Sequence, residues 1–144
     1  MSKPVELAFE AALENLERVQ DEVERFAEAE QLSTKASYAL SLCLEELLTN
    51  VVMHGHSSDA NGTRICLTMV SVDNQVRVTI EDNGQPYDPT ETPEPDLDAL
   101  LEDRPIGGLG VHLVRELAQR FDYCHRDGKN CVAIAIDRQL GEGA

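Results

Sequence analysis

The chain has 144 residues, with 27 acidic and 12 basic side chains and a formal net charge of −15. Its length suits one domain with one core, and its hydrophobic content of 42% is ordinary for a globular protein. The negative charge disfavours contact with nucleic acid backbones, so we expect no direct DNA or RNA binding. No apolar run is long enough to cross a bilayer, and residues 1–9 carry no apolar signal-peptide segment, so we expect a cytoplasmic protein that does not bind membranes.

Hydrophobic periodicity predicts the elements in chain order. A strand is expected at 5–9, a helix at 15–30, and a second helix that Ser33 or Thr34 caps and that runs to about Met53. The remaining predictions are a hairpin of 63–72 and 75–81, a long acidic loop at 85–105 with at most a short helix at 96–101, a third helix at 109–120, and a hairpin of 123–126 and 131–137. This order predicts an α+β two-layer sandwich, a mostly antiparallel sheet with helices on one face.

The cysteines show no pattern of a disulfide framework or a zinc site, because no pair has the Cys-x-x-Cys spacing. Three of the four fall in apolar periodic segments, which predicts buried free thiols. The pair His54 and His56 has no Cys or carboxylate spaced to complete a site, so we expect no transition metal. The four cysteines are Cys43, Cys66, Cys124 and Cys131.

The second helix carries three polar residues at intervals of four, Glu46, Asn50 and His54, which place them on one helix face. The amide oxygen of Asn50 suits Mg²⁺ in the presence of phosphate, and Glu46 can orient or deprotonate an attacking hydroxyl. A solvated polar helix edge gives the same spacing, and for this helix taken alone it is the stronger interpretation.

The strand expected at 75–81 runs directly into Asp82-Asn83-Gly84. An Asp at a strand end can accept a hydrogen bond from an exocyclic amine such as that of adenine. Gly84 lets the backbone approach a flat base, because no Cβ intervenes. A plain turn is the alternative, since Asp-x-Gly sequences are common turn formers.

A glycine-rich turn, Gly107-Gly108-Leu109-Gly110-Val111, leads into the third helix. Successive N–H groups of such a turn, together with the positive helix N-terminus, form a phosphate site. Arg104 is equally well explained as a phosphate partner or as a surface charge. The turn is neither a P-loop nor a dinucleotide motif, because Gly-Lys-Ser/Thr is absent and no strand precedes it. In combination, the three stretches predict an ATP-binding protein and favour a kinase.

The same three stretches resemble the GHKL (Bergerat-type) ATP-binding fold and, within it, the anti-sigma-factor serine/threonine kinases of bacterial partner-switching systems. The run from Glu46 through Asn50 to His54 is similar to the family's N-box. Residues 82–89 are similar to its first glycine box, and the sequence from Gly107 onward resembles its second. The resemblance covers nearly the whole chain, so we expect residues 1–144 to form a single histidine-kinase-like ATP-binding domain.

The resemblance implies ATP and Mg²⁺ as cofactors and assigns roles to individual residues. It makes Glu46 the catalytic base and Asn50 the Mg²⁺ ligand. It also has Asp82 hold the adenine amino group, Gly84 pack by the base and residues 85–106 form the lid over ATP. By the same resemblance, Gly108 and Gly110 shape the phosphate turn. The other candidate cofactor-binding residues around this turn are Arg104, Gly107, Leu109 and Val111.

The implied substrate is a Ser or Thr hydroxyl on a STAS-domain antagonist protein, and the second implied partner is a sigma factor. The family commonly dimerises, so a homodimer through the first helix and a sheet edge is a further expectation by analogy. One feature departs from the family pattern. Many members carry a Gly-Thr pair in the last hairpin, whose hydroxyl helps at the adenine, whereas this chain reads Gly128-Lys129-Asn130.

Two other functions are compatible with the same glycines. In the first, ATP only selects a conformation that captures a partner protein, and no phosphoryl group moves. In the second, the chain is the catalytic domain of a sensor histidine kinase, which we disfavour because the chain has no room for a dimerisation hairpin with a phospho-acceptor His. His112 lies on the helix after the glycine turn, where we expect it to pack.

Overall fold

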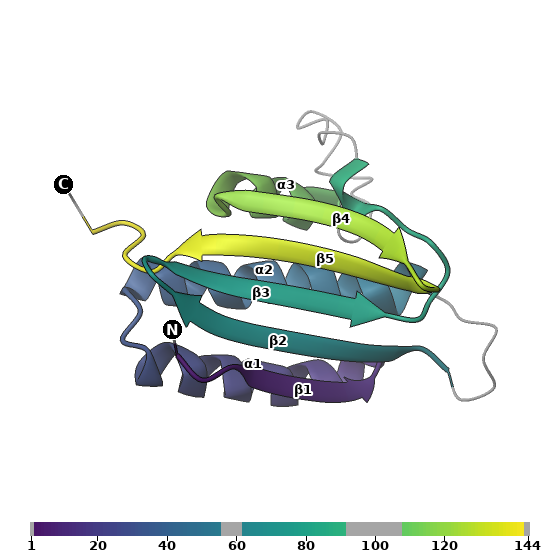
Figure 1. The fold of residues 1–144 in the computed structure, drawn as a ribbon, viewed down its shortest axis with the longest axis horizontal. Coiled ribbons are helices and arrows are strands. Elements are labelled where there is room, and N and C mark those ends of the chain that lie inside the picture. The colour runs from purple at the N-terminus through teal and green to yellow at the C-terminus, as the bar shows by residue number, and fades with distance from the viewer. Residues whose placement is uncertain (1, 56–61, 92–107, 143–144) are drawn as a thin grey trace, which may run out of the picture.

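The computed structural model describes residues 2–55, 62–91 and 108–142, without the side chains of 108–110 (Figure 1). The described part confirms the expected α+β class and the order of its elements. The strands are β1 (Val5–Glu10), β2 (Arg64–Val72), β3 (Gln75–Asp82), β4 (Arg120–Arg126) and β5 (Lys129–Asp137). The helices are α1 (Leu13–Ala29), α2 (Thr34–His54), the short 3₁₀ helix η1 (Pro89–Glu91) and α3 (Gly108–Leu117).

The strands form one sheet in the order β1-β2-β3-β5-β4, and every pairing in it is antiparallel. Figure 1 shows the helices gathered behind this sheet, with α2 crossing behind its centre. The fold is therefore a two-layer sandwich with one open sheet face, as the sequence predicts. None of the described helices is both long and apolar enough to cross a membrane.

Strand alternation divides the sheet into a core face and an open face. The core face packs on the apolar stripe of α2, and its side chains are almost fully buried. Those from the three central strands are Ile65, Leu67, Met69, Val76, Val78, Ile80, Val132, Ile134 and Ile136; those from α2 are Leu40, Cys43, Leu44, Leu47 and Leu48.

The start of α2 is fixed by Ser33, which settles the choice between Ser33 and Thr34. The Ser33 Oγ accepts a hydrogen bond from the Ala36 N–H at 3.1 Å and donates to the carbonyl of Leu140 at 2.7 Å. The first contact satisfies an orphan helix donor, and the second ties the helix to the chain after β5. Ser33 therefore sets the register of α2 against the sheet.

The C-terminal part of the chain differs from the prediction at one junction. The helix α3 ends at Leu117 rather than at 120, and β4 begins at Arg120 rather than at 123. Pairing with β5 explains the difference, because Phe121 lies opposite Ile134 in the sheet. Strand pairing with β5 thus overrides the helical periodicity of residues 118–120, which the sequence assigned to the helix.

The expectation that three of the four cysteines are buried is wrong. Cys43 is buried in α2, and this burial raises the pKa of its thiol to about 12. Cys66 and Cys124 are exposed, and Cys131 is half-buried. Strand alternation directs these three toward the sheet face that no described helix covers, so apolar neighbours along the strand did not imply burial.

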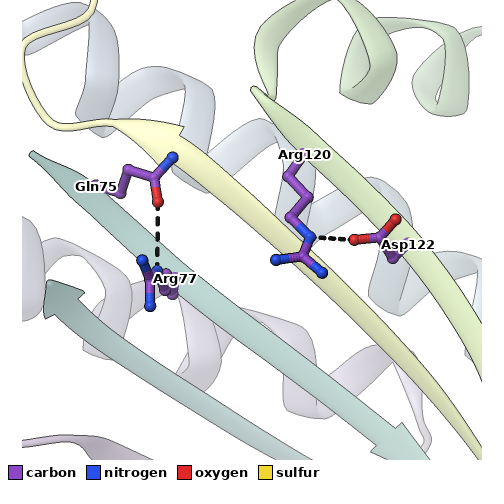
Figure 2. A network of polar contacts seen from close by, with 4 residues as sticks. All are labelled: Gln75, Arg77, Arg120 and Asp122. Atoms are coloured by element: carbon purple, nitrogen blue, oxygen red, sulfur yellow. Dashed lines mark hydrogen bonds and ion pairs between the residues drawn. The ribbon is translucent and has the colours of Figure 1, made fainter.

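The open face also carries charged side chains that contact neighbours on their own strand. Figure 2 shows Arg77 donating to the side-chain oxygen of Gln75 at 3.3 Å, and Arg120 paired with Asp122. Each pair is two residues apart, the spacing that returns to the same face of a strand. These contacts are exposed, and such pairs stabilise a fold by at most about 1 kcal/mol.

Candidate functional site

A pocket lies between the C-terminal half of α2, the end of β3, the start of β5 and the segment that follows β3. Its wall is mostly apolar with a few polar groups, the usual character of a small-molecule site. The lining residues are Leu47, Asn50, Val51, Gly55, Ile80, Asp82, Tyr87, Pro89, Asn130 and Val132. Of the residues expected to bind ATP, the pocket thus brings together Asn50 and Asp82.

Asp82 is the last residue of β3, and its side chain is 5% exposed. Its Oδ1 accepts hydrogen bonds from the Gly84 N–H at 2.9 Å and from the Asn130 Nδ2 at 3.0 Å. Both bonds reach the same oxygen, and no residue in the described ranges donates to Oδ2. The carboxylate is therefore held in one orientation with one oxygen left for a ligand.

Gly84 follows this strand end where the chain passes the end of α2. A Cβ on Gly84 would lie 2.2 Å from the carbonyl oxygen of Gly55, which is closer than any real side-chain atom approaches backbone. A glycine is thus required here by the protein's own packing. The contact of Gly84 with a nucleotide base stays a prediction.

Asn130 is a site residue that the sequence reasoning did not identify. It is 3% exposed near the start of β5 and lies directly opposite Asp82 in the sheet. A signal was present in the sequence, because residue 130 shares the inward side of the strand with Val132, Ile134 and Ile136. A polar side chain at such a position indicates a buried hydrogen-bonding role.

The helical part of the site comes from α2, where Asn50 is 5% exposed. Its Nδ2 is buried and has no hydrogen-bond partner in the described part of the chain. A buried amide without a partner is uncommon and indicates a polar ligand or ion that the protein alone does not supply. Phosphate oxygens fit this requirement, because they accept hydrogen bonds from an amide donor.

Glu46 lies one helical turn before Asn50 and is half-buried. It is not among the residues that line the pocket, although Leu47 and Asn50 of the same helix are. His54, one turn after Asn50, turns to a different partner, since its ring stacks on Tyr87 with centroids 4.6 Å apart. The three polar residues of the helix face therefore do not converge on one point.

The segment after β3 is tied to both α2 and α3. Gln85 Nε2 donates to the carbonyl of His54 at 3.0 Å, and the Asp88 Oδ1 accepts from the Thr90 N–H at 2.8 Å. Arg115 of α3 donates to the carbonyl of Thr90. These contacts place the first residues of the expected lid against the pocket.

The expected phosphate turn is described only in part. The helix α3 spans Gly108–Leu117, so Gly108 and Gly110 lie within the helix rather than in a turn before it. Val111 is 1% exposed and packs inside. Arg104, Gly107 and most of the expected lid lie outside the described residues. The phosphate-binding roles of Gly108, Leu109, Gly110 and Val111 stay predictions.

Comparison with known proteins identifies the family. Residues 9–136 match the model of the histidine kinase-like ATPase domain. The chain belongs to this family. ATP is thereby its nucleotide.

A relative within the histidine kinase-like ATPase family narrows the assignment. The serine/threonine-protein kinase BtrW of Bordetella bronchiseptica is 34% identical over 112 residues, which cover 78% of this chain and 78% of the relative. This relationship confirms the expectation of a serine/threonine-protein kinase and of the family to which the sequence motifs pointed.

Solved structures agree on the fold. The RsbU and RsbW domains of a Mycobacterium tuberculosis protein match 94% of this chain with a TM-score of 0.69 at 15% identity, although the match spans only 32% of that longer chain. The blue-light activated histidine kinase EL346 of Erythrobacter litoralis matches 77% of this chain with a TM-score of 0.57 at 22% identity, over 33% of its own length. At these identities the likeness concerns the fold alone.

Proposed function

We propose that this kinase transfers the γ-phosphoryl group of ATP to a Ser or Thr hydroxyl of a STAS-domain antagonist protein, within a partner-switching system whose further partner is a sigma factor. The observation that carries the proposal is the 34% identity to a serine/threonine-protein kinase over 112 residues, which cover 78% of this chain. The N-box sequence at 46–54 and the glycine box at 82–89, quoted above, support the narrower choice of substrate.

Different residues of the pocket bind different parts of ATP. The free Oδ2 of Asp82 accepts a hydrogen bond from the adenine amino group, while apolar side chains of α2 and β5 enclose the ring. Asn50 faces the phosphates, where its partnerless amide gains a hydrogen-bonding or ligand role. Glu46, one helical turn before Asn50, accepts the proton of the attacking hydroxyl.

Mg²⁺ bound with ATP supplies charge neutralisation at the transferring phosphoryl group. Asn50 would hold it through its amide oxygen, with phosphate oxygens and waters as the other ligands. The described residues contain no cluster of three or more His, Cys, Asp or Glu side chains suited to a metal ion. The proposed ion therefore depends on the nucleotide for most of its ligands.

The test is phosphoryl transfer from γ-labelled ATP to STAS-domain proteins that this chain captures in a pull-down. We expect Glu46→Gln to reduce transfer by about 10²–10⁴-fold, the range for loss of a general base, with ATP affinity unchanged. The matched control is Glu45→Gln, which removes the same charge from the neighbouring, exposed position of α2 and should transfer at the wild-type rate.

The outcomes separate the competing functions. Acid-stable label on a Ser or Thr, lost with Glu46→Gln and kept with Glu45→Gln, supports the proposal. Full transfer by Glu46→Gln removes Glu46 as the base. ATP-dependent capture without any label makes the protein a nucleotide-gated binder, and acid-labile label on a His makes it a histidine kinase.

A further inference from the structure

Asn130 is the most heavily bonded side chain of the pocket. Its Nδ2 donates to Asp82 Oδ1 at 3.0 Å and to the carbonyl of Gln85 at 2.9 Å, with the carbonyl of Gly84 further away at 3.4 Å. Its Oδ1 accepts from the Tyr87 N–H at 3.2 Å and from the Tyr123 hydroxyl. One buried amide thus joins β3, β4, β5 and the start of the expected lid.

The orientation of this amide follows from its neighbours. Every group near Nδ2 is an acceptor, and every group near Oδ1 is a donor. A flipped amide would set its oxygen against the Asp82 carboxylate and two carbonyls, and its nitrogen against the Tyr87 N–H, which leaves four mismatched contacts in a buried place. The network therefore admits one arrangement only, and Asn130 is fixed as a donor to Asp82.

This arrangement decides which oxygen of Asp82 a ligand meets. The N–H groups of Asn130 and Gly84 both occupy Oδ1, so the carboxylate cannot rotate without breaking two buried bonds. Oδ2 remains as a pure acceptor beside the pocket. An acceptor in a fixed position matches an exocyclic amino group and repels a carbonyl oxygen at the same place on a purine.

We propose that Asn130 is a positioning residue that sets nucleobase specificity: by holding Asp82 in one orientation, it makes the pocket select an aminopurine over an oxopurine. The proposal rests on the proposed function, since it requires ATP to bind in this pocket. It differs from the hydroxyl contact expected of the family, because the carboxamide of Asn130 acts on Asp82 and on the lid backbone rather than on the base.

Removal of the amide frees the carboxylate. In Asn130→Ala, the Oδ1 of Asp82 keeps only the Gly84 N–H, and the space of the lost amide admits water. A carboxylate that can turn, with water beside it, accommodates the carbonyl of hypoxanthine as well as the amine of adenine. Asn130→Ala should therefore reduce the preference for adenine over hypoxanthine more than it reduces the affinity for ATP.

The experiment is calorimetric titration with ATP and with ITP, which differ at this one purine substituent. We expect the wild type to prefer ATP by about 10- to 100-fold, the range for a hydrogen bond to a charged group. Asn130→Ala should bring the two affinities within about threefold of each other. Asn130→Thr, which keeps a hydroxyl donor of smaller reach, should retain an intermediate preference.

A control variant distinguishes a change in nucleotide specificity from a general loss of stability. Tyr123→Phe removes the hydroxyl that donates to Asn130 Oδ1 but leaves the bond to Asp82 in place, so it should lower thermal stability and keep the wild-type ATP:ITP ratio. If Asn130→Ala does not fold, Asn130→Thr carries the test in its place.

Three outcomes would each contradict either the specificity role of Asn130 or the proposed function. Equal weakening of both nucleotides by Asn130→Ala or Asn130→Thr, with an unchanged ratio, would overturn the specificity role. Equal affinity of the wild type for ATP and ITP would overturn it as well. Failure of the wild type to bind either nucleotide would instead contradict the proposed function, so the two failures are distinguishable.

Discussion

The close approach of Gly84 to the carbonyl oxygen of Gly55 joins the segment after β3 to the end of α2 at the pocket. A Cβ added at Gly84 would lie 2.2 Å from this oxygen, far closer than a normal contact. The oxygen belongs to the backbone and cannot move aside as the end of a flexible side chain could. The position therefore couples two pocket walls, the strand end that carries Asp82 and the helix end that carries Asn50.

Gly84→Ala should separate these walls. We expect a loss of about 1–3 kcal/mol in the free energy of unfolding, the usual cost of overpacking, together with a loss of ATP affinity, because Asp82 and Asn50 move apart. Chemical denaturation and calorimetry measure the two effects.

The matched control is Gly141→Ala, which also crowds and strains the chain but lies at the other end of α2. Its Cβ would meet the flexible side chain of Lys35 at 2.5 Å, and its φ is +80°. We expect reduced stability with wild-type ATP affinity. Normal ATP binding by Gly84→Ala would show that the two walls are not coupled through this contact.

Individual site residues were predictable from sequence when the motif lay within a short stretch. Asp82 and Asn50, which the motifs singled out, both line one pocket, and their roles toward ATP stay predictions. Asn130 was not predicted, because its partners other than Tyr123 lie 43–48 residues earlier in the chain and meet it through the β3–β5 register. A turn-like sequence around residue 130 concealed that the side chain points inward.

The helix α2 carries the functional side of the pocket over its last turns, and its first turn is anchored at the opposite end of the sheet. Ser33 makes both anchoring contacts, to Ala36 within the helix and to Leu140 after β5. A helix rises about 1.5 Å per residue, so an anchor at residue 33 fixes the axial position of residues about 25 Å away.

Loss of this cap should destabilise the fold without removing a site residue. Ser33→Ala is expected to cost about 0.5–2 kcal/mol in the free energy of unfolding, whereas Thr34→Ala, exposed and one residue later, should stay within about 0.5 kcal/mol of the wild type. Thermal and urea unfolding measure both variants. Equal losses in the two would contradict the assignment of Ser33 as the cap.

The helices and strands were largely predictable because their periodicity is strong. The apolar stripe of α2 and the alternation in β2 and β3 both carry through to the core. The errors arise where long-range pairing decides, as at the junction of α3 and β4. The exposure of the cysteines was not predictable from their apolar neighbours, because alternation along a strand does not show which sheet face the helices cover.

Charge is unevenly distributed over the whole molecule. The helix α1 carries acidic side chains at Glu14, Glu17, Asp21, Glu22, Glu24 and Glu28. The open sheet face carries both signs of charge. Its cations are Arg64, Arg77, Arg120, Arg126 and Lys129, and its acidic side chains are Glu6, Glu10, Glu81, Asp122 and Asp137. The net charge of the protein is −15, so its overall field repels an anionic nucleotide. Amide donors in the pocket and bound Mg²⁺ must offset this repulsion.

We expect ATP to bind in the pocket beside Asp82, and the most direct test is the thermal stabilisation of the whole protein by ATP with Mg²⁺. A ligand at 100 times its dissociation constant stabilises the folded state by about 2.7 kcal/mol. We predict that the wild type and the exposed control Asp122→Asn show a shift of this size in unfolding, and that Asp82→Asn needs about 10- to 100-fold more ATP to reach it. An equal shift in Asp82→Asn and in the wild type, at the same ATP concentration, would contradict the account.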